Sequence, residues 1–117
     1  MARLPLTVTD IDRVLSAPPA LFTATGSDGF YFDNSSGNVF LEVISSTTGQ
    51  SFTVKTGLVI EDEWTVADDL VNVSAASTTY FIGRYPTNIY NQPDGSNQVY
   101  VDHAVNAVLQ FRAWRLL

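Results

Sequence analysis

The residues of this chain that could perform polar chemistry are few. Its 117 residues include one histidine, His103, and no cysteine. His103 follows Asp102, and an aspartate beside a histidine suggests a catalytic dyad or part of a metal site. Because neighbouring residues of a strand point to opposite faces, these two side chains are not expected to converge on one ion or substrate. We therefore expect His103 to be structural and predict no catalytic residue.

Two acidic clusters suggest a second kind of chemistry. One cluster is Glu61, Asp62 and Glu63, and the other is Asp68 and Asp69. Loop carboxylates bind Ca²⁺, and two carboxyl groups at a fixed separation hydrolyse glycosidic bonds. The clusters lack the spacing of an EF-hand loop, and nothing in the sequence sets the distance between two carboxyl groups. We expect solvated loops, no bound metal, no cofactor and no enzymatic activity.

Aromatic side chains leave more alternatives open. Tyr and Trp stack on sugars, and they are enriched at protein–protein contacts. They can equally pack in the core of the protein itself. Pro86 and Pro93 stiffen the segment 85–97, so that a partner could bind it at a lower entropic cost. We take Tyr85, Tyr90 and Trp114 as candidate protein-contact residues.

The charge of the chain excludes some partners. The net charge is −6, and only 15% of the residues are charged. Binding to nucleic acid depends on clustered Lys and Arg, whereas the six basic residues here are scattered. No apolar run approaches the ~20 residues of a membrane-spanning helix, and the first residues lack the apolar core of a secretion signal. We expect neither nucleic acid nor a membrane as partner, and synthesis in a cytoplasm.

The elements expected to position these residues are β-strands. Short runs of alternating apolar and polar residues recur along the chain, separated by Gly, Asn, Asp, Ser and Pro. Examples are Val39–Ile44, 52–60, Val99–Asp102 and 107–116. About eight or nine such strands at regular spacing are typical of a sandwich or barrel. The sequence predicts an all-β, single-domain antiparallel β-sandwich or barrel over residues 20–117.

Residues 1–19 have a different pattern and predict an extended N-terminal arm. Leu4, Leu6 and Val8 alternate with other residues as in a strand, and we take them as contacts with a neighbouring protein. Residues 9–15 fit one short helical turn, which is too short to be stable alone. Pro18 and Pro19 end any helix. Deletion of the arm is expected to leave the β domain folded and to weaken binding to the neighbour.

A family resemblance rests on turn and strand patterns rather than on a chemical signature. It covers roughly residues 20–117 and leaves out the first 19. The segments that carry it are Gly26–Phe30, Asp33-Asn34, Phe40–Val43, Phe81–Pro86, Ile89–Gly95, Val99–Asp102 and Phe111–Leu116. In this order they resemble small head proteins of tailed bacteriophages.

The resemblance implies a capsid decoration, or cement, protein. Such a protein binds the outside of the phage head and stabilises it, often as a trimer at local three-fold positions. Its partner would be the major capsid protein, its place the surface of the virion, and its site of synthesis the host cytoplasm. Two alternatives stay open: another structural part of the virion, such as a head–tail connector or tail subunit, and a carbohydrate-binding module.

Overall fold

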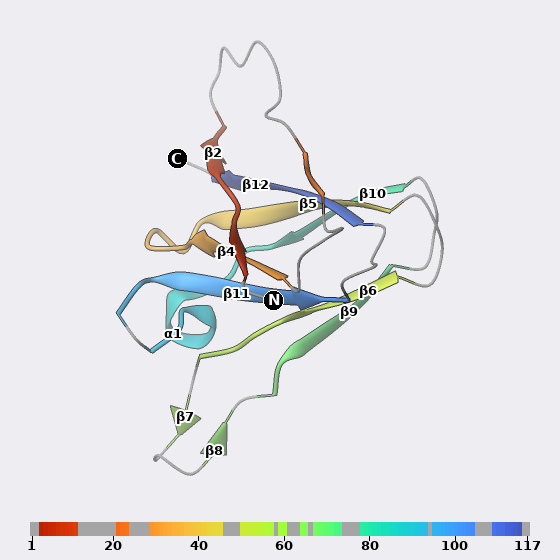
Figure 1. Ribbon diagram of the computed structural model, residues 1–117. Coiled ribbons are helices and arrows are strands. Elements are labelled where there is room, and N and C mark those ends of the chain that lie inside the picture. The colour runs from red at the N-terminus through yellow and green to blue at the C-terminus, as the bar shows by residue number, and fades with distance from the viewer. Residues whose placement is uncertain are drawn as a thin grey trace.

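The computed structural model shows a β-sandwich of two five-stranded sheets (Figure 1). It describes residues 3–11, 21–23, 29–45, 50–57, 59–60, 64–65, 67–73, 78–93, 95–104 and 109–115, and for residues 59–60, 64–65 and 78 only the backbone. The predicted all-β fold is confirmed in its coarser form, since the described residues are mostly in strands and include one short helix. Of the two predicted architectures the chain adopts the sandwich, since the sheets in the described ranges do not close into a barrel.

The first sheet, sheet A, has the strand order β1–β4–β11–β6–β9. β1 runs parallel to β4, and the other neighbours are antiparallel. The strands of sheet A are β1 (Leu4–Pro5), β4 (Gly29–Asp33), β6 (Gln50–Val54), β9 (Asp69–Val73) and β11 (Gln98–His103).

The second sheet, sheet B, has the order β10–β5–β12–β2, and β3 also pairs with β12. β2 is parallel to β12, and the other pairs are antiparallel. Its strands are β2 (Val8–Asp10), β3 (Phe22–Thr23), β5 (Val39–Ser45), β10 (Thr78–Gly83) and β12 (Leu109–Arg115). Outside the two sheets, β7 (Val59–Ile60) pairs with β8 (Trp64–Thr65), and α1 (Thr87–Tyr90) precedes β11.

The two strands nearest the N-terminus, which lie in the segment predicted to be an arm, make both sheets mixed rather than purely antiparallel. β1 lies parallel to β4 in sheet A, and β2 lies parallel to β12 in sheet B. Residues 3–11 therefore cross from one sheet to the other and give each an edge strand (Figure 1). At the start of the helical turn predicted over residues 9–15, Thr9 and Asp10 belong to β2, and the amide of Ile11 donates a hydrogen bond to the carbonyl of Arg115. The rest of that turn and Pro18-Pro19 lie outside the described residues.

The core lies between the sheets because the long strands alternate between an inward apolar face and an outward face. The alternation predicted for the last strand is confirmed, since Leu109, Phe111 and Ala113 are buried on one face of β12. Leu6, between β1 and β2, belongs to the same core. The largest apolar side chains that are fully buried are Phe30, Phe32, Val39, Leu41, Val43, Phe52, Val54, Val99, Val101, Leu109 and Phe111.

The apolar run expected to continue from Phe52 to Ile60 is interrupted near Gly57. β6 ends at Val54, and the amide of Gly57 donates a hydrogen bond of 2.7 Å to the carbonyl of Ile89. A β-carbon at Gly57 would lie 2.1 Å from the carbonyl oxygen of Asn91. The backbone around α1 thus packs directly on Gly57, and only glycine leaves room for it.

Candidate contact surfaces

The six residues predicted to contact a partner are spread over different parts of the sandwich. Leu4 is 45% exposed on the edge strand β1, whereas Leu6 is buried and Val8 packs against the core. Trp114 is buried on β12. The roles of these residues in binding stay predictions, but in the isolated chain only Leu4 among these four offers a largely exposed apolar side chain.

Tyr85 and Tyr90 are brought together by the turn that contains α1. Their rings lie 5.1 Å apart in an edge-to-face arrangement. Tyr85 is only 3% exposed and belongs to the core, while Tyr90 is half-buried beside it. The hydroxyl of Tyr90 donates a hydrogen bond to a carboxylate oxygen of Asp69 on β9. The pair therefore anchors the α1 turn to sheet A. This arrangement agrees with the alternative stated above, that these tyrosines pack within the protein itself.

Asn34 supports the same turn from the end of β4. Its amide nitrogen donates to the carbonyl oxygen of Tyr85 and to the side-chain oxygen of Asn91, both at 2.8 Å. Asn91 returns a bond of 3.2 Å to the carbonyl of Asn34. Because Asn34 is fully buried, these bonds satisfy groups that water cannot reach. The segment after β10 is thereby held by side chains as well as by its backbone.

The hydrogen bond to Asp69, burial and the charge of Asp69 together raise the pKa of Tyr90 to about 12. A raised pKa means that the protonated phenol is favoured in the folded state. Its contribution to stability is complete below the ordinary value of 10.0 and is lost as the pH rises through the folded value. We expect the difference in unfolding free energy between the wild type and Tyr90→Phe to shrink across this window, as measured by urea unfolding at several pH values.

Asp69→Asn provides the matched variant for this prediction. It removes the charge and the strong acceptor, so the pKa of Tyr90 should fall towards its ordinary value, as followed by tyrosinate absorbance. A stability difference between wild type and Tyr90→Phe that stays constant through the alkaline window would contradict the prediction.

Trp114 is held by a polar group on the outer face of sheet B. Glu42 on β5 is buried and accepts hydrogen bonds of 2.9 Å from the indole nitrogen of Trp114 and from Arg112. Arg112 and Glu42 are direct cross-strand neighbours. The donor of Trp114 is therefore already used within the chain, as is usual for a buried indole.

The histidine and the described acidic residues also have structural partners. The His103 ring is buried and lies 6.3 Å from the rings of Phe30 and Phe111. Glu61, Asp62 and Glu63 lie outside the described residues. The described part of the chain contains no group of three or more His, Asp or Glu side chains placed to hold a metal ion.

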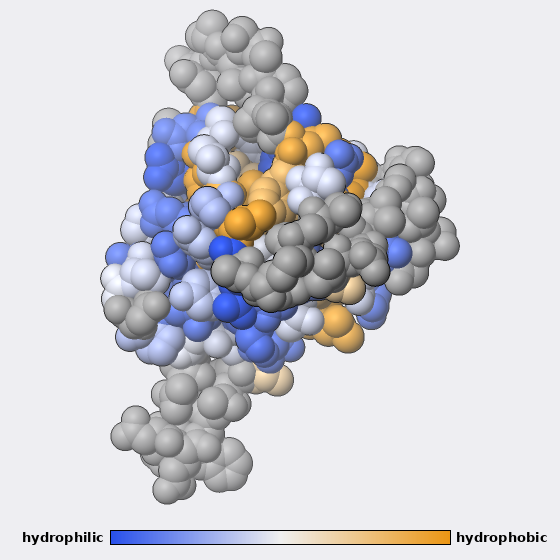
Figure 2. All heavy atoms as spheres, in the orientation of Figure 1, coloured by the Kyte–Doolittle hydropathy of each residue, from blue (hydrophilic) through white to orange (hydrophobic). Residues whose placement is uncertain are grey.

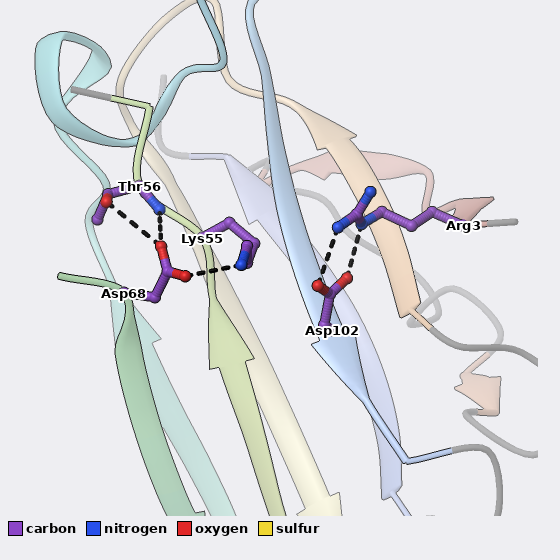
Figure 3. A network of polar contacts seen from close by, with 5 residues as sticks. All are labelled: Arg3, Lys55, Thr56, Asp68 and Asp102. Carbon is purple, nitrogen blue, oxygen red and sulfur yellow. Dashed lines mark hydrogen bonds and ion pairs between the residues drawn. The ribbon is translucent and has the colours of Figure 1, made fainter. Parts of the chain in front are cut away.

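Asp68 accepts hydrogen bonds from Thr56 and forms an ion pair of 2.7 Å with Lys55, and Arg3 contacts both carboxylate oxygens of Asp102 (Figure 3). Burial opposes ionisation of Asp68, but the bonds from Lys55 and Thr56 outweigh it and hold the pKa of Asp68 below its usual value. Both networks connect neighbouring segments of the body.

The outer face of sheet B at β10 carries an apolar surface that the sequence reading did not identify. Phe81 is 63% exposed, and its ring lies 5.9 Å from that of Phe40. We call this surface the β10 patch, a shallow hollow of about 190 Å³ lined by Phe40, Phe81, Ile82, Gly83 and Arg84. The signal in the sequence was the uninterrupted run Tyr80-Phe81-Ile82, because a strand with apolar residues on both faces leaves one of them outside the core.

Gly83 shapes the β10 patch through its backbone. Its φ is +141°, a conformation that glycine adopts without steric cost. A β-carbon there would lie 2.7 Å from the β-carbon of Phe40 and 2.9 Å from its α-carbon, so β5 lies directly against the bare backbone of Gly83. The next residue, Arg84, is exposed.

Apolar side chains are also exposed elsewhere on the body. Leu70 on β9 is as exposed as Phe81, and Leu4 and Ile11 are exposed near β1 and β2. In the orientation of Figure 2, apolar residues gather near β5 and β12, while the region of β11 is largely hydrophilic. Such patches on an otherwise polar surface mark sites of association.

Comparison with models of known protein families, with curated proteins and with solved structures finds no match to this chain. No helix within the described residues has the length and apolar character needed to span a membrane.

Proposed function

We propose that this chain is a structural protein that binds the outside of a bacteriophage head and stabilises it, as an oligomer of identical copies. The observation that carries the proposal is the combination of a closely packed sandwich with large apolar side chains left exposed on its edge strands, Phe81 and Leu70 above all. The sequence resemblance to small phage head proteins suggests that the partner is the major capsid protein and that the oligomer is a trimer.

The physical basis of such a function is preferential binding. A protein that binds the assembled head more tightly than its dissociated subunits stabilises the head by mass action, by about 2.7 kcal/mol for each site at a free concentration of 100 times the Kd. Many identical copies on one head add to this without any chemical reaction. A rigid body with exposed contact patches is sufficient, and no acid, base or metal is required.

The carbohydrate-binding alternative has less support from the described aromatic residues. A glycan-binding face needs aromatic rings exposed in a row, whereas Tyr85 and Trp114 are buried. Tyr100 is partly covered by Arg3, whose guanidinium carbon lies 4.4 Å from the ring centre. A connector or tail subunit is also a structural part of the virion, and the place on the virion at which the chain binds separates it from a decoration protein.

The test uses heads of the phage that encodes the chain, assembled without it. Purified protein is added to mature heads and to unexpanded precursors, and bound copies are counted by cryo-electron microscopy. We expect binding to the outside of mature heads and a higher temperature of head disruption in calorimetry.

Binding restricted to one vertex would favour the connector alternative, and absence from heads together with retention on a glycan column would favour the carbohydrate-binding module. Either result would overturn the proposal.

A further inference from the structure

The two lateral edges of sheet B are complementary in a way that points to contact between copies. Within the described strands, β10 pairs only with β5, and β2 pairs only with β12. Each edge therefore presents backbone groups without a strand partner. Natural edge strands are usually protected by charges or proline, but β10 contains neither in its six residues.

The registers of sheet B place the ends of the two edge strands at the same level. Gly83 pairs with Phe40, Phe40 with Trp114, and Trp114 with Thr9. These four residues form one row that crosses the sheet from β10 to β2. The next row on the β2 side contains Asp10, and the next residue on the β10 side is Arg84.

The strand directions also agree. β10 is antiparallel to β5, β5 is antiparallel to β12, and β12 is parallel to β2, so β10 and β2 run in the same direction. A second copy related by rotation about an axis along the strands keeps that direction. Its β2 then lies parallel to β10 of the first copy, with Asp10 at the level of Arg84.

The charges at these positions are complementary. Arg84 is exposed and, within the described part of the chain, has no carboxylate partner. Every other described basic residue has one, in the pairs Arg3–Asp102, Lys55–Asp68, Arg112–Glu42 and Arg115–Asp10.

One carboxylate oxygen of Asp10 is available to accept a hydrogen bond from Arg84 of another copy. Arg115 contacts only its Oδ1, at 2.6 Å from Nε and 2.5 Å from Nη2. The second oxygen, Oδ2, accepts no hydrogen bond from the described residues, and the side chain is 41% exposed. A carboxylate can accept from two guanidinium groups at once, one on each oxygen.

Apolar side chains accompany both charges. Phe81 lies three residues before Arg84 in the β10 patch, and Ile11 directly follows Asp10 and is exposed. An aromatic residue and an arginine beside a hollow are the side-chain types that dominate protein contacts.

We propose that copies of this chain associate head to tail, with β10 of one copy lying along β2 of the next and Arg84 facing Asp10. The contact uses two different surfaces, so it closes into a ring when the rotation between copies divides a full turn and continues as a filament when it does not. It rests on no property of a phage head and is tested on the purified chain alone.

Single cysteines test the contact without background, because the chain has none of its own. Asp10→Cys and Arg84→Cys are made in separate chains, mixed and mildly oxidised. Within one chain the two positions are three strand spacings apart, roughly 14 Å, so a disulfide between them must join two copies. The lost ion pair is exposed and contributes little, so the contact should persist.

We expect the mixture to give on the order of tenfold more covalent dimer than either variant alone, since a disulfide needs close and oriented β-carbons. A mixture of Arg84→Cys with Leu70→Cys is the control for random collision. Abundant dimers of Arg84→Cys alone would indicate pairing of β10 with β10 and would overturn the proposal, as would a mixture no better than the control.

Sedimentation of uncrosslinked protein gives the second measurement. Phe81→Ser should weaken self-association by about tenfold, because it removes a large exposed apolar group from the β10 edge. Leu70→Ser removes an equally exposed group from sheet A and should leave self-association unchanged. Equal effects of the two substitutions, or a wild type that stays monomeric at the highest soluble concentration, would contradict head-to-tail association.

Discussion

Replacing Phe111 by alanine is expected to lower the free energy of unfolding by about 3–5 kcal/mol. Phe111 lies in the middle strand of sheet B and is fully buried. Its ring is 4.6 Å from that of Phe30 and 5.4 Å from that of Phe52, two residues of the opposite sheet. The substitution leaves a cavity where the sheets meet, and the rigid strands on either side cannot collapse to fill it.

Phe81→Ala is the matched control, because it removes the same atoms from a largely exposed position. Its effect is expected to stay within about 0.5 kcal/mol, as for most surface substitutions. Chemical unfolding monitored by circular dichroism gives both values. Similar losses for the two variants would mean that Phe111 does not have the central packing role that its ring contacts indicate.

Much of the sandwich could be predicted from alternation alone. The strand predicted at Val39–Ile44 is β5, and alternate residues of the predicted run 107–116, Leu109, Phe111 and Ala113, form the buried face of β12. These strands are long enough for a period of two to stand out, and their inward residues are strongly apolar. The alternation of Leu4, Leu6 and Val8 also indicates extended backbone where β1 and β2 lie, but it cannot show with which strands these short segments pair, because their partners are distant in sequence.

The candidate contact residues show where sequence reasoning stops. Tyr85 follows the charged and exposed Arg84, and nothing in the sequence says that the chain turns inward between them. The turn depends on Gly83 and on the hydrogen bond that Asn34 donates from 51 positions away in the sequence. For Phe81 the error has the opposite sign: the side chain is exposed, although an apolar residue between two other apolar residues of a strand is normally assigned to the core.

The second large effect is expected from deletion of residues 2–17. From the sequence, this deletion should leave the β domain folded. In the structure, residues 3–11 supply an edge strand to each sheet, and Leu6 is part of the core. The ion pairs of Arg3 with Asp102 and of Asp10 with Arg115 also join this segment to the body. We therefore expect the truncated chain to lose several kcal/mol of an unfolding free energy that is typically about 5–15 kcal/mol.

Two leucine substitutions separate the packing of this segment from its exposed surface. Leu6→Ala is expected to cost about 2–5 kcal/mol, because the side chain is buried between the sheets. Leu4→Ala, two residues earlier and 45% exposed, is expected to cost less than about 0.5 kcal/mol. Urea unfolding of the two variants and of the truncated chain gives all three values. If Leu6→Ala and the truncated chain both unfold at the wild-type urea concentration, residues 3–11 are an arm that the body does not need, and the stability argument for their position is wrong.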